Sequence, residues 1–405
     1  MKLEKQPYMP YKPSGGLLPK EEMLEVAKRS KSLTIGLPGD DAQLENRISL
    51  VPNAVGLLVQ NGHRVLIERE SGQHAWFSDH EYAEYGGEIV DKPEVFKADI
   101  VMKVASLCKD EIEQLNTKAT VFTSLQFTSQ HEEYFRMLMQ KKITALAFEY
   151  IQDKTGAYPV RRAMSEMAGT ASVMTAAEYL SHPESGKGHM LGGFSGISPS
   201  EVVILGAGTV GEYAARAALG MGAMVKIFDN SIYKLKSLQN HLSQPIFTSV
   251  IQPNVLLKAL KTADVVIAAL FTSSGLTPIY VSEEMVSQMK PGSMIIDVSI
   301  DQGGCVETSQ PTDHRNPIFV KYGVIHYCVP NIASRFPHTA SYALSNFLAP
   351  ILLATGQAGG IDSILKENVG VRRGTYMFNG IVTNRQVSDY FRLPYQEIDL
   401  LLTAF

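Results

Sequence analysis

The chain has 405 residues, a length that predicts about two to four domains at the usual 100–200 residues per domain. Apolar residues make up 45% and charged residues 19%, which is globular composition and argues against a disordered or fibrous chain. The formal net charge is −4, from 37 basic and 41 acidic residues, so no surplus of positive charge favours nucleic acid or an anionic membrane as a partner.

Cysteine content and the first residues indicate the compartment. Cys108, Cys305 and Cys328 are too few for a disulfide framework and show no CxxC spacing, so we expect a reducing environment and no metal site. The opening MKLEKQPYMPYKPSGG has the pattern of neither a secretion signal nor a lipidation motif, and every apolar run falls short of the roughly 20 residues that cross a bilayer. The sequence therefore predicts a cytoplasmic protein without a membrane segment.

The first part of the chain alternates short apolar runs with amphipathic segments. Helices are expected over Ser49–Gln60, which Asn61-Gly62 ends, and over Glu132–Gln140. Strands are expected over Leu33–Pro38, His63–Glu68, Asp99–Val104, Ala119–Ser124 and Thr144–Tyr150. This alternation is typical of a parallel sheet covered by helices.

A predicted helix over Ser165–Leu180, with Ser165 as its N-cap, connects this part to a second series of apolar runs. The five strands expected there are Val202–Gly206, Lys226–Asp229, Val265–Leu270, Met294–Ser299 and Val324–Val329. The last stretch, Ala340–Phe405, has a helical pattern without strands and is too short for an independent core, so we expect it to pack onto an earlier domain.

The motif Gly206-Ala207-Gly208-Thr209-Val210-Gly211 lies between an expected strand and the helical segment EYAARAALGMG. In a dinucleotide-binding turn the first glycine permits the tight bend, the second admits a pyrophosphate and the third allows close helix packing. Asp229, at the end of the next strand, stands where an acid would bind the ribose. Its carboxylate favours NAD over NADP, although Lys226 and Lys234 lie close in sequence.

Two further strand ends are candidates for a ligand site, because ligands gather at the carboxyl ends of parallel strands. Ala269, Leu270 and Phe271 end one strand and would cover the adenine or the nicotinamide ribose, or serve as ordinary core. Asp297 and Asp301 bracket IIDVSIDQGG, and we expect one of these two carboxylates to face the cleft.

From about residue 33 onwards the chain resembles the alanine dehydrogenases, a family shared with the soluble domain of nicotinamide nucleotide transhydrogenase. The matching segments include GLPGDDAQLENRISLVPNAV, AFEYIQ, MSEMAGTASV, VVILGAGTVGEYAARAALGMGA, IDQGG and CVPN. The resemblance implies an α/β protein with two Rossmann-like doubly wound domains. It implies a catalytic domain over 33–160 and 338–405, an inserted NAD-binding domain over 161–337, and an added N-terminal extension over 1–32. It also implies a homo-oligomer that interconverts L-alanine, water and NAD with pyruvate, ammonium and NADH.

The same resemblance assigns roles to single residues. Arg47 corresponds to the arginine that grips the substrate carboxylate, with Glu45 orienting it, and Asp301 to an aspartate near the nicotinamide that handles protons or orders water. Asn331 corresponds to a cleft residue, and Ser165 to a serine that approaches the cofactor or only caps its helix. The residues expected to contact the cofactor are Ser165, Gly206, Gly208, Thr209, Val210, Gly211, Asp229, Lys234, Ser249, Ala269, Leu270, Asp301 and Asn331.

Two positions depart from the family pattern. Ala105 occupies the place of the family's catalytic lysine, and Gln126 that of its histidine, although a glutamine cannot exchange a proton near pH 7. Lys103 offers a substitute, because residues two apart on a strand share a face and a long side chain spans the displacement of about 6.6–6.8 Å. The alternative is that Lys103 extends to solvent at the strand end.

Three hypotheses follow for the function. The leading one is an NAD-dependent enzyme of the alanine dehydrogenase type, with Arg47, Lys103, Gln126 and Asp301 at its catalytic site and a small 2-oxo or 2-amino acid as substrate. The second is a catalytically impaired NAD(H)-binding regulatory protein, which Ala105 and Gln126 motivate. The third is a transhydrogenase-like subunit, which would need a separate NADP-binding partner because the sequence carries one glycine fingerprint.

Overall fold

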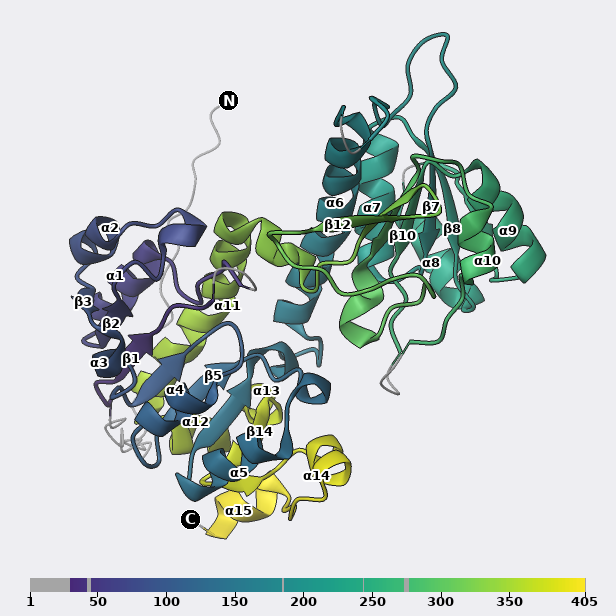
Figure 1. Ribbon diagram of the computed structural model, residues 1–405. Helices are drawn as coiled ribbons and strands as arrows, with labels where there is room; N and C mark the ends of the chain where they lie inside the picture. The colour runs from purple at the N-terminus through teal and green to yellow at the C-terminus, as the bar shows by residue number, and fades with distance from the viewer. Residues whose placement is uncertain (1–29, 42–44, 184–185, 243, 273–276, 405) are drawn as a thin grey trace, which may run out of the picture.

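The computed structural model describes residues 30–41, 45–183, 186–242, 244–272 and 277–404. These residues form two lobes, each built on a largely parallel sheet with helices on both faces (Figure 1). The two doubly wound α/β units confirm the predicted fold class. The predicted extension over 1–32 lies outside the described residues except at its last positions.

The first lobe contains an eight-stranded sheet in the order β15-β14-β6-β5-β4-β1-β2-β3. Six neighbouring strands, from β6 to β3, are parallel, whereas β14 and β15 run antiparallel at one edge. Its strands are β1 Thr34–Leu37, β2 Arg64–Glu68, β3 Glu88–Val90, β4 Ile100–Met102, β5 Thr120–Thr123, β6 Thr144–Ala147, β14 Thr375–Phe378 and β15 Ile381–Val382.

Helices from both ends of the described chain cover this sheet. They are α1 Pro52–Gln60, α2 Asp79–Glu84, α3 Lys92–Val95, α4 Lys109–Gln114, α5 Glu132–Gln140, α11 Pro337–Ala358, α12 Ile361–Glu367, α13 Val369–Arg373, α14 Arg385–Phe391 and α15 Ile398–Ala404. The core on one face joins α1 to α11 through residues such as Leu58 and Leu348, and the core on the other joins α5 to β14 through Phe135 and Tyr376.

The second lobe contains a seven-stranded sheet in the order β12-β13-β11-β10-β7-β8-β9, with only β12 antiparallel among its described strands. Its strands are β7 Glu201–Leu205, β8 Met224–Phe228, β9 Phe247–Ser249, β10 Val265–Ala268, β11 Met294–Asp297, β12 Ile318–Lys321 and β13 Val324–Tyr327. Its helices are α7 Thr209–Gly220, α8 Ile232–His241, α9 Pro253–Thr262 and α10 Glu283–Ser287.

Two long helices cross between the lobes (Figure 1). Helix α6, Pro159–Ser181, packs its first turns against the core of the first lobe at Val160 and its later turns against α7 of the second. Helix α11 returns the chain to the first lobe. Among the described helices no single one is long and apolar enough to span a bilayer, although α11 with α12, bent by 102°, passes that test as a pair.

Three expectations about the elements were wrong. The helix expected from Ser165 begins at Pro159, so Ser165 lies inside it and does not cap it; proline is well suited to a first helical turn because it has no N–H to leave unpaired. The stretch after Ala340 was expected to lack strands but supplies β14 and β15, because β14 pairs with the edge of β6. Lys103 lies beyond β4, which ends at Met102, so the two-residue strand period does not relate it to Ala105.

The other expected helices and strands are present with shifted bounds. All of the strands expected in the second series are present, and two short edge strands, β9 and β12, were missed. The C-terminal stretch packs onto the first lobe as expected.

Candidate functional site

The glycine motif forms the turn between β7 and α7 in the second lobe. Gly206 has a φ of 113°, and a Cβ there would lie 2.4 Å from the carbonyl oxygen of Ala269. A Cβ at Gly211 would lie 1.9 Å from the carbonyl oxygen of Gly206, whereas the space beside Gly208 is open. Thr209 and Val210 begin α7, so the amides of its first turn point toward this open space and can bind a phosphate.

Asp229 lies at the end of β8, beside this turn, and is buried. Its Oδ2 accepts a hydrogen bond of 2.8 Å from the Ala207 amide, and its Oδ1 one of 2.7 Å from the Ser231 amide. The carboxylate is therefore held rigidly against the glycine turn, in the position where an acid reaches a ribose.

A pocket opens between the glycine turn and the end of β10. Six of the predicted cofactor contacts line it: Gly206, Gly208, Asp229, Lys234, Ala269 and Leu270. The predicted contacts that do not line it are Ser165, Thr209, Val210, Gly211, Ser249, Asp301 and Asn331. The Ser249 hydroxyl donates to the Val250 carbonyl. The residues that line the pocket are Gly206, Gly208, Asp229, Asn230, Lys234, Ala269, Leu270, Phe271, Thr272 and Tyr280. Asn230, Thr272 and Tyr280 were not predicted from the sequence.

Arg47 precedes α1 in the first lobe and is 8% exposed. Its Nε and Nη2 donate to Oε1 and Oε2 of Glu45 at 2.7 and 2.6 Å, and its Nη1 lies 3.1 Å from Sδ of Met164 on α6. Burial disfavours charge on Glu45, but the Arg47 guanidinium outweighs it and lowers the pKa of this carboxyl. The pair is a buried ion pair that keeps the guanidinium in one orientation.

Serine hydroxyls from the C-terminal part of the chain hold the backbone around Arg47. The amides of Asn46, Ile48 and Val51 donate to the hydroxyls of Ser334, Ser341 and Ser345 at 3.0, 2.9 and 3.2 Å. Ser341 and Ser345 lie one turn apart on α11, and Ser334 lies just before that helix. This irregular segment is therefore positioned by residues almost 300 positions away in the sequence.

Asn331 connects the arginine pair to the second lobe. Its Nδ2 donates to Glu45 Oε2 at 2.7 Å, and its backbone amide donates to Asp301 Oδ1 at 3.1 Å. Asn331 has a φ of 58°, a left-handed conformation that asparagine tolerates better than most residues. The Asp301 side chain is exposed by area, yet the protein atoms crowded around it disfavour its charge and raise its pKa to about 6. The structure thus brings together Arg47, Asp301 and Asn331, as the sequence predicts.

Lys103 does not project freely into the site. Its Nζ lies 2.9 Å from Oε2 of Glu111 and 3.2 Å from Oδ1 of Asp40, and its side chain is buried. Burial disfavours the ammonium, but these two carboxylates outweigh it and raise the pKa of Lys103. Asp40 also accepts from the amides of Val104 and Ala105 at 3.2 and 3.3 Å.

Gln126 follows β5 in a left-handed conformation with a φ of 34°. Beside it, Oε1 of Glu149 accepts a hydrogen bond of 2.7 Å from the Leu125 amide, while the buried Oε2 has no hydrogen-bond partner among the described residues. Burial raises the pKa of Glu149 to about 7. Gln126 and Glu149 lie just after the neighbouring strands β5 and β6, on the same edge of the sheet as Asp40 and Lys103, which follow β1 and β4.

Sequence reasoning missed Asp40, Glu111 and Glu149. The available signal was the one that selected Asp297 and Asp301, an acidic residue just after a buried strand, and it applies equally to Asp40 and Glu149. Glu111 carried no such signal, because it reaches Lys103 from the first turn of α4.

Comparisons with known proteins agree with this fold. Family models described as the N-terminal and C-terminal domains of alanine dehydrogenase/PNT match residues 36–170 and 172–385. The alanine dehydrogenases of Methanococcus maripaludis and Bacillus subtilis are 38% and 37% identical to the chain, over 90% and 88% of it and over 98% and 94% of their own lengths. A solved L-alanine dehydrogenase superposes with a TM-score of 0.83 at 32% identity, over 89% of this chain and 99% of that one. A transhydrogenase from Sinorhizobium meliloti, at 20% identity and a TM-score of 0.73 over 87% of this chain and 99% of that one, shares the fold.

Proposed function

Because the chain belongs to the alanine dehydrogenase/PNT family, we propose that it is an NAD-dependent oxidoreductase that interconverts L-alanine, water and NAD with pyruvate, ammonium and NADH. The observation that carries the proposal is the pairing of a dinucleotide turn in one lobe with a buried arginine in the other, joined through Asn331.

The residues of the second lobe fit NAD. The turn at Gly206, Gly208 and Gly211 admits a pyrophosphate, Thr209 and Val210 supply the helix amides, and Asp229 would bind the ribose. We propose Lys234, Ala269 and Leu270 as further contacts of the cofactor. Ser249 lies behind Asp229, and its carbonyl accepts a hydrogen bond from the Asp229 amide. Bound NAD supplies the hydride acceptor of the reaction.

Arg47 would bind the substrate carboxylate. A guanidinium has five N–H donors, of which Glu45 and Met164 take three, so two remain for a carboxylate. Asp301 and Asn331 lie beside this pair on the second lobe, where they would order the reacting groups, and Ser165 follows Met164 on α6. Gln126 would donate or accept a hydrogen bond without exchanging a proton, and Lys103 acts through the carboxylates it binds.

We propose a substrate domain over 33–160 and 338–405 and a nucleotide domain over 161–337, preceded by an extension over 1–32. The bridging helices α6 and α11 lie at both junctions. We propose further that the protein is cytoplasmic and a homo-oligomer that acts on a small 2-amino or 2-oxo acid, without a nucleic acid partner; its net charge of −4 supports the last point.

The test is turnover of NADH with pyruvate and ammonium, and of NAD with L-alanine, by wild type and by Arg47→Lys. A lysine loses the planar fork, so we expect the KM for pyruvate to rise at least about tenfold with NADH affinity unchanged by calorimetry. Absence of wild-type turnover in both directions would overturn the proposal.

Ala105 and Gln126 support a second candidate, an NAD(H)-binding protein that regulates a partner. They remove the two side chains that the family resemblance assigns to proton transfer. Tight NADH binding without turnover of any small 2-oxo acid would favour this function.

A further inference from the structure

Asp40 is a buried carboxylate at the carboxyl edge of the first sheet, three residues after β1. Only 4% of its side chain is exposed. Its Oδ2 accepts from the amides of Val104 and Ala105, which follow the neighbouring strand β4, and its Oδ1 lies 3.2 Å from Lys103 Nζ. Two backbone amides therefore hold one oxygen of the carboxylate, and an ammonium forms an ion pair with the other.

The positive charge that faces Asp40 is shared. Lys103 also binds Glu111 at 2.9 Å, so one ammonium serves two buried carboxylates. Lys92 binds the other oxygen of Glu111, also at 2.9 Å, from a side chain 42% exposed to solvent. An unbroken series of ion pairs therefore leads from Asp40 to the surface of the first lobe.

The charge of Asp40 also interacts with the arginine pair. Burial disfavours the charge on Arg47, but Glu45, and after it Asp40 and Asp301, raise the pKa of the guanidinium. Glu45 in turn repels the charge of Asp40. The charged groups that act on Asp40 are therefore Lys103, Glu45 and Arg47, and Glu111 shares the ammonium of Lys103 with it.

The reaction needs a group that exchanges a proton. Oxidation of an amino acid with NAD and water yields a 2-oxo acid, ammonium, NADH and one further proton. Arg47 stays charged at every working pH, Gln126 has no exchangeable proton near pH 7, and the two carboxylates keep Lys103 protonated. Asp40 is a carboxyl group that accepts from the backbone amide of Ala105 and whose charge also acts on Arg47.

We propose that Asp40 accepts the proton released during oxidation of the amino acid bound at Arg47, and that Lys103 is the residue that positions it. This assignment rests on the proposed function.

The ammonium group of the substrate first loses one proton to solvent, and hydride loss from C2 then leaves an iminium. The oxygen of a water molecule bonds to C2 while one of its O–H bonds breaks, and that proton goes to the carboxylate of Asp40. The C–N bond breaks next: the nitrogen takes up the proton of the new hydroxyl and leaves as ammonia, which takes up a proton from solvent. The products are the 2-oxo acid and ammonium, and Asp40 releases its proton to solvent before the next turnover. In the reverse direction Asp40 returns its proton to the hydroxyl that leaves C2 as water.

The electrostatics of Asp40 suit this task. Burial raises the pKa of Asp40 from 3.8 to about 6, against the opposing effect of Lys103. The group is therefore mostly ionised at pH 7 and accepts a proton, yet it releases that proton at little cost. A base whose pKa lies near the working pH is the most effective one.

The experiment compares pH profiles of kcat for L-alanine oxidation in wild type and Asp40→Asn. We expect the wild-type rate to fall on the acid side with a midpoint near 6, and Asp40→Asn to lower kcat about 100-fold and to lose this limb, with KM within about threefold. Lys103→Met should move the limb to higher pH, because it removes a charge that lowers the pKa of Asp40, and Lys103→Arg should restore it.

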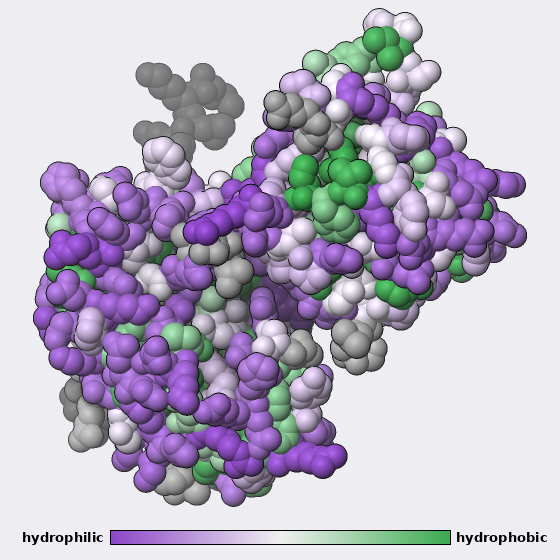
Figure 2. Space-filling view, in the orientation of Figure 1, coloured by the Kyte–Doolittle hydropathy of each residue, from purple (hydrophilic) through white to green (hydrophobic). Residues whose placement is uncertain are grey.

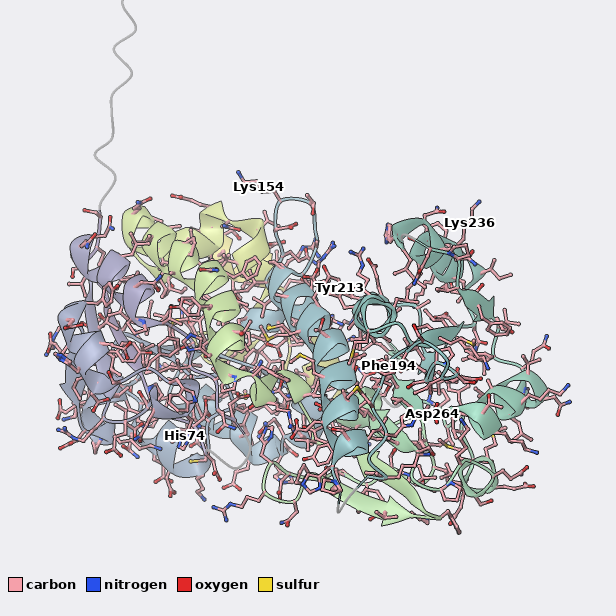
Figure 3. The ribbon with its side chains drawn as sticks, turned by 90° about the horizontal axis from the view of Figure 1, so that it is seen from above. His74, Lys154, Phe194, Tyr213, Lys236 and Asp264 are labelled. Carbon is pink, nitrogen blue, oxygen red and sulfur yellow. The ribbon has the colours of Figure 1, made fainter. Side chains whose placement is uncertain are left out.

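Asp264→Asn is the matched control. Asp264 is likewise buried, lies 3.0 Å from Lys290 Nζ and accepts from the Glu201 amide at 2.9 Å. It lies at the amino end of β10, in the second lobe and away from the first (Figure 3). This variant should keep the acid limb, whatever stability it loses.

A second readout does not depend on turnover. In protein carrying ¹³C-labelled aspartate and no nucleotide, the carboxyl resonance that Asp40→Asn removes should titrate near pH 6 and move upward in Lys103→Met. An acid limb that persists in Asp40→Asn would assign it to Asp301 and overturn this inference alone, as would a resonance that stays ionised to pH 4. Absence of wild-type turnover would overturn the proposed function, and this inference with it.

Discussion

At the scale of single residues, the site contains buried charged side chains that are paired with side chains of opposite charge. Arg47 is neutralised by Glu45 within the same short segment, so its pairing was available to sequence reasoning. Lys103 is paired with Asp40, which follows another strand, and with Glu111, which lies on a helix. Because of this pairing, its ammonium positions the two carboxylates and does not extend freely into the site. The side chains of Ala105 and Gln126 take no part in these ion pairs.

Glu149 gives a prediction about stability at this scale. Its pKa is raised from 4.5 to about 7 in the folded protein, so between these pH values the folded state binds more protons than the unfolded state. The stability it contributes is present below pH 4.5 and is lost as the pH rises through 7. Glu149→Gln should therefore unfold at nearly the wild-type urea concentration at pH 4.5 and be more stable by roughly 1–3 kcal/mol at pH 8.

The measurement is urea unfolding of both proteins at pH 4.5 and pH 8. Glu113→Gln, an exposed change on α4, should show the same small difference at both pH values. An equal difference at both pH values for Glu149→Gln would mean that its charge is not suppressed by burial.

At the scale of elements, the contact between α6 and α7 positions the dinucleotide turn. Gly169 on α6 allows this close approach, because a Cβ there would lie 2.3 Å from the Val210 carbonyl oxygen and 2.8 Å from the Ala214 amide. Tyr213, on the same helix as Val210, is seen beside α6 in Figure 3. The position of α7, and of the phosphate-binding amides at its start, therefore depends on a glycine outside the glycine motif.

Gly169→Ala should displace α7. Backbone atoms cannot yield as a flexible side chain can, so we expect a loss of about 1–3 kcal/mol in unfolding free energy and a fall of about tenfold or more in NADH affinity. Denaturant unfolding and calorimetric titration with NADH measure the two effects.

Gly220→Ala, at the end of α7, is the control. A Cβ there meets nothing within 4 Å, so the substitution should stabilise the helix by about 0.5–1 kcal/mol and leave NADH affinity unchanged. Equal NADH affinity in both alanine variants would show that the helix contact does not set the turn.

At the scale of the whole molecule, the site is assembled from distant parts of the chain. Figure 1 shows α11 returning from the second lobe to the first, where its serines hold the segment around Arg47. Figure 2 shows apolar side chains gathered on the viewed face of the second lobe, whereas the first lobe is mainly hydrophilic on that side. On this face the two lobes therefore differ in the polarity of their surfaces.

Ser341→Ala tests this long-range support. It leaves the buried Ile48 amide without its partner, which should cost about 1–3 kcal/mol of unfolding free energy and lower kcat/KM for pyruvate by loosening Arg47. NADH affinity should not change, because Ser341 lies outside the second lobe's pocket.

Ser287→Ala is the comparison, since this exposed hydroxyl of α10 donates only to a carbonyl of its own helix. It should leave the unfolding free energy within about 0.5 kcal/mol of wild type and kcat/KM within about twofold. Equal kcat/KM in the two variants would mean that the Ser341 hydroxyl does not control the position of Arg47.

The sequence by itself determined the two α/β units, the glycine turn and Asp229, because each depends on local order: strand, turn and helix follow one another within about 30 residues. Arg47 was indicated by the resemblance to the alanine dehydrogenases and not by local order. The sequence could not determine that β14 and β15 extend the first sheet or that α6 begins at Pro159, since pairing with β6 and packing between lobes outweigh local pattern. Only the tertiary structure decided the state of Lys103, Asp40 and Glu149. Their protonation depends on burial and on charges brought from other strand ends, and neither quantity is encoded in spacing along the chain.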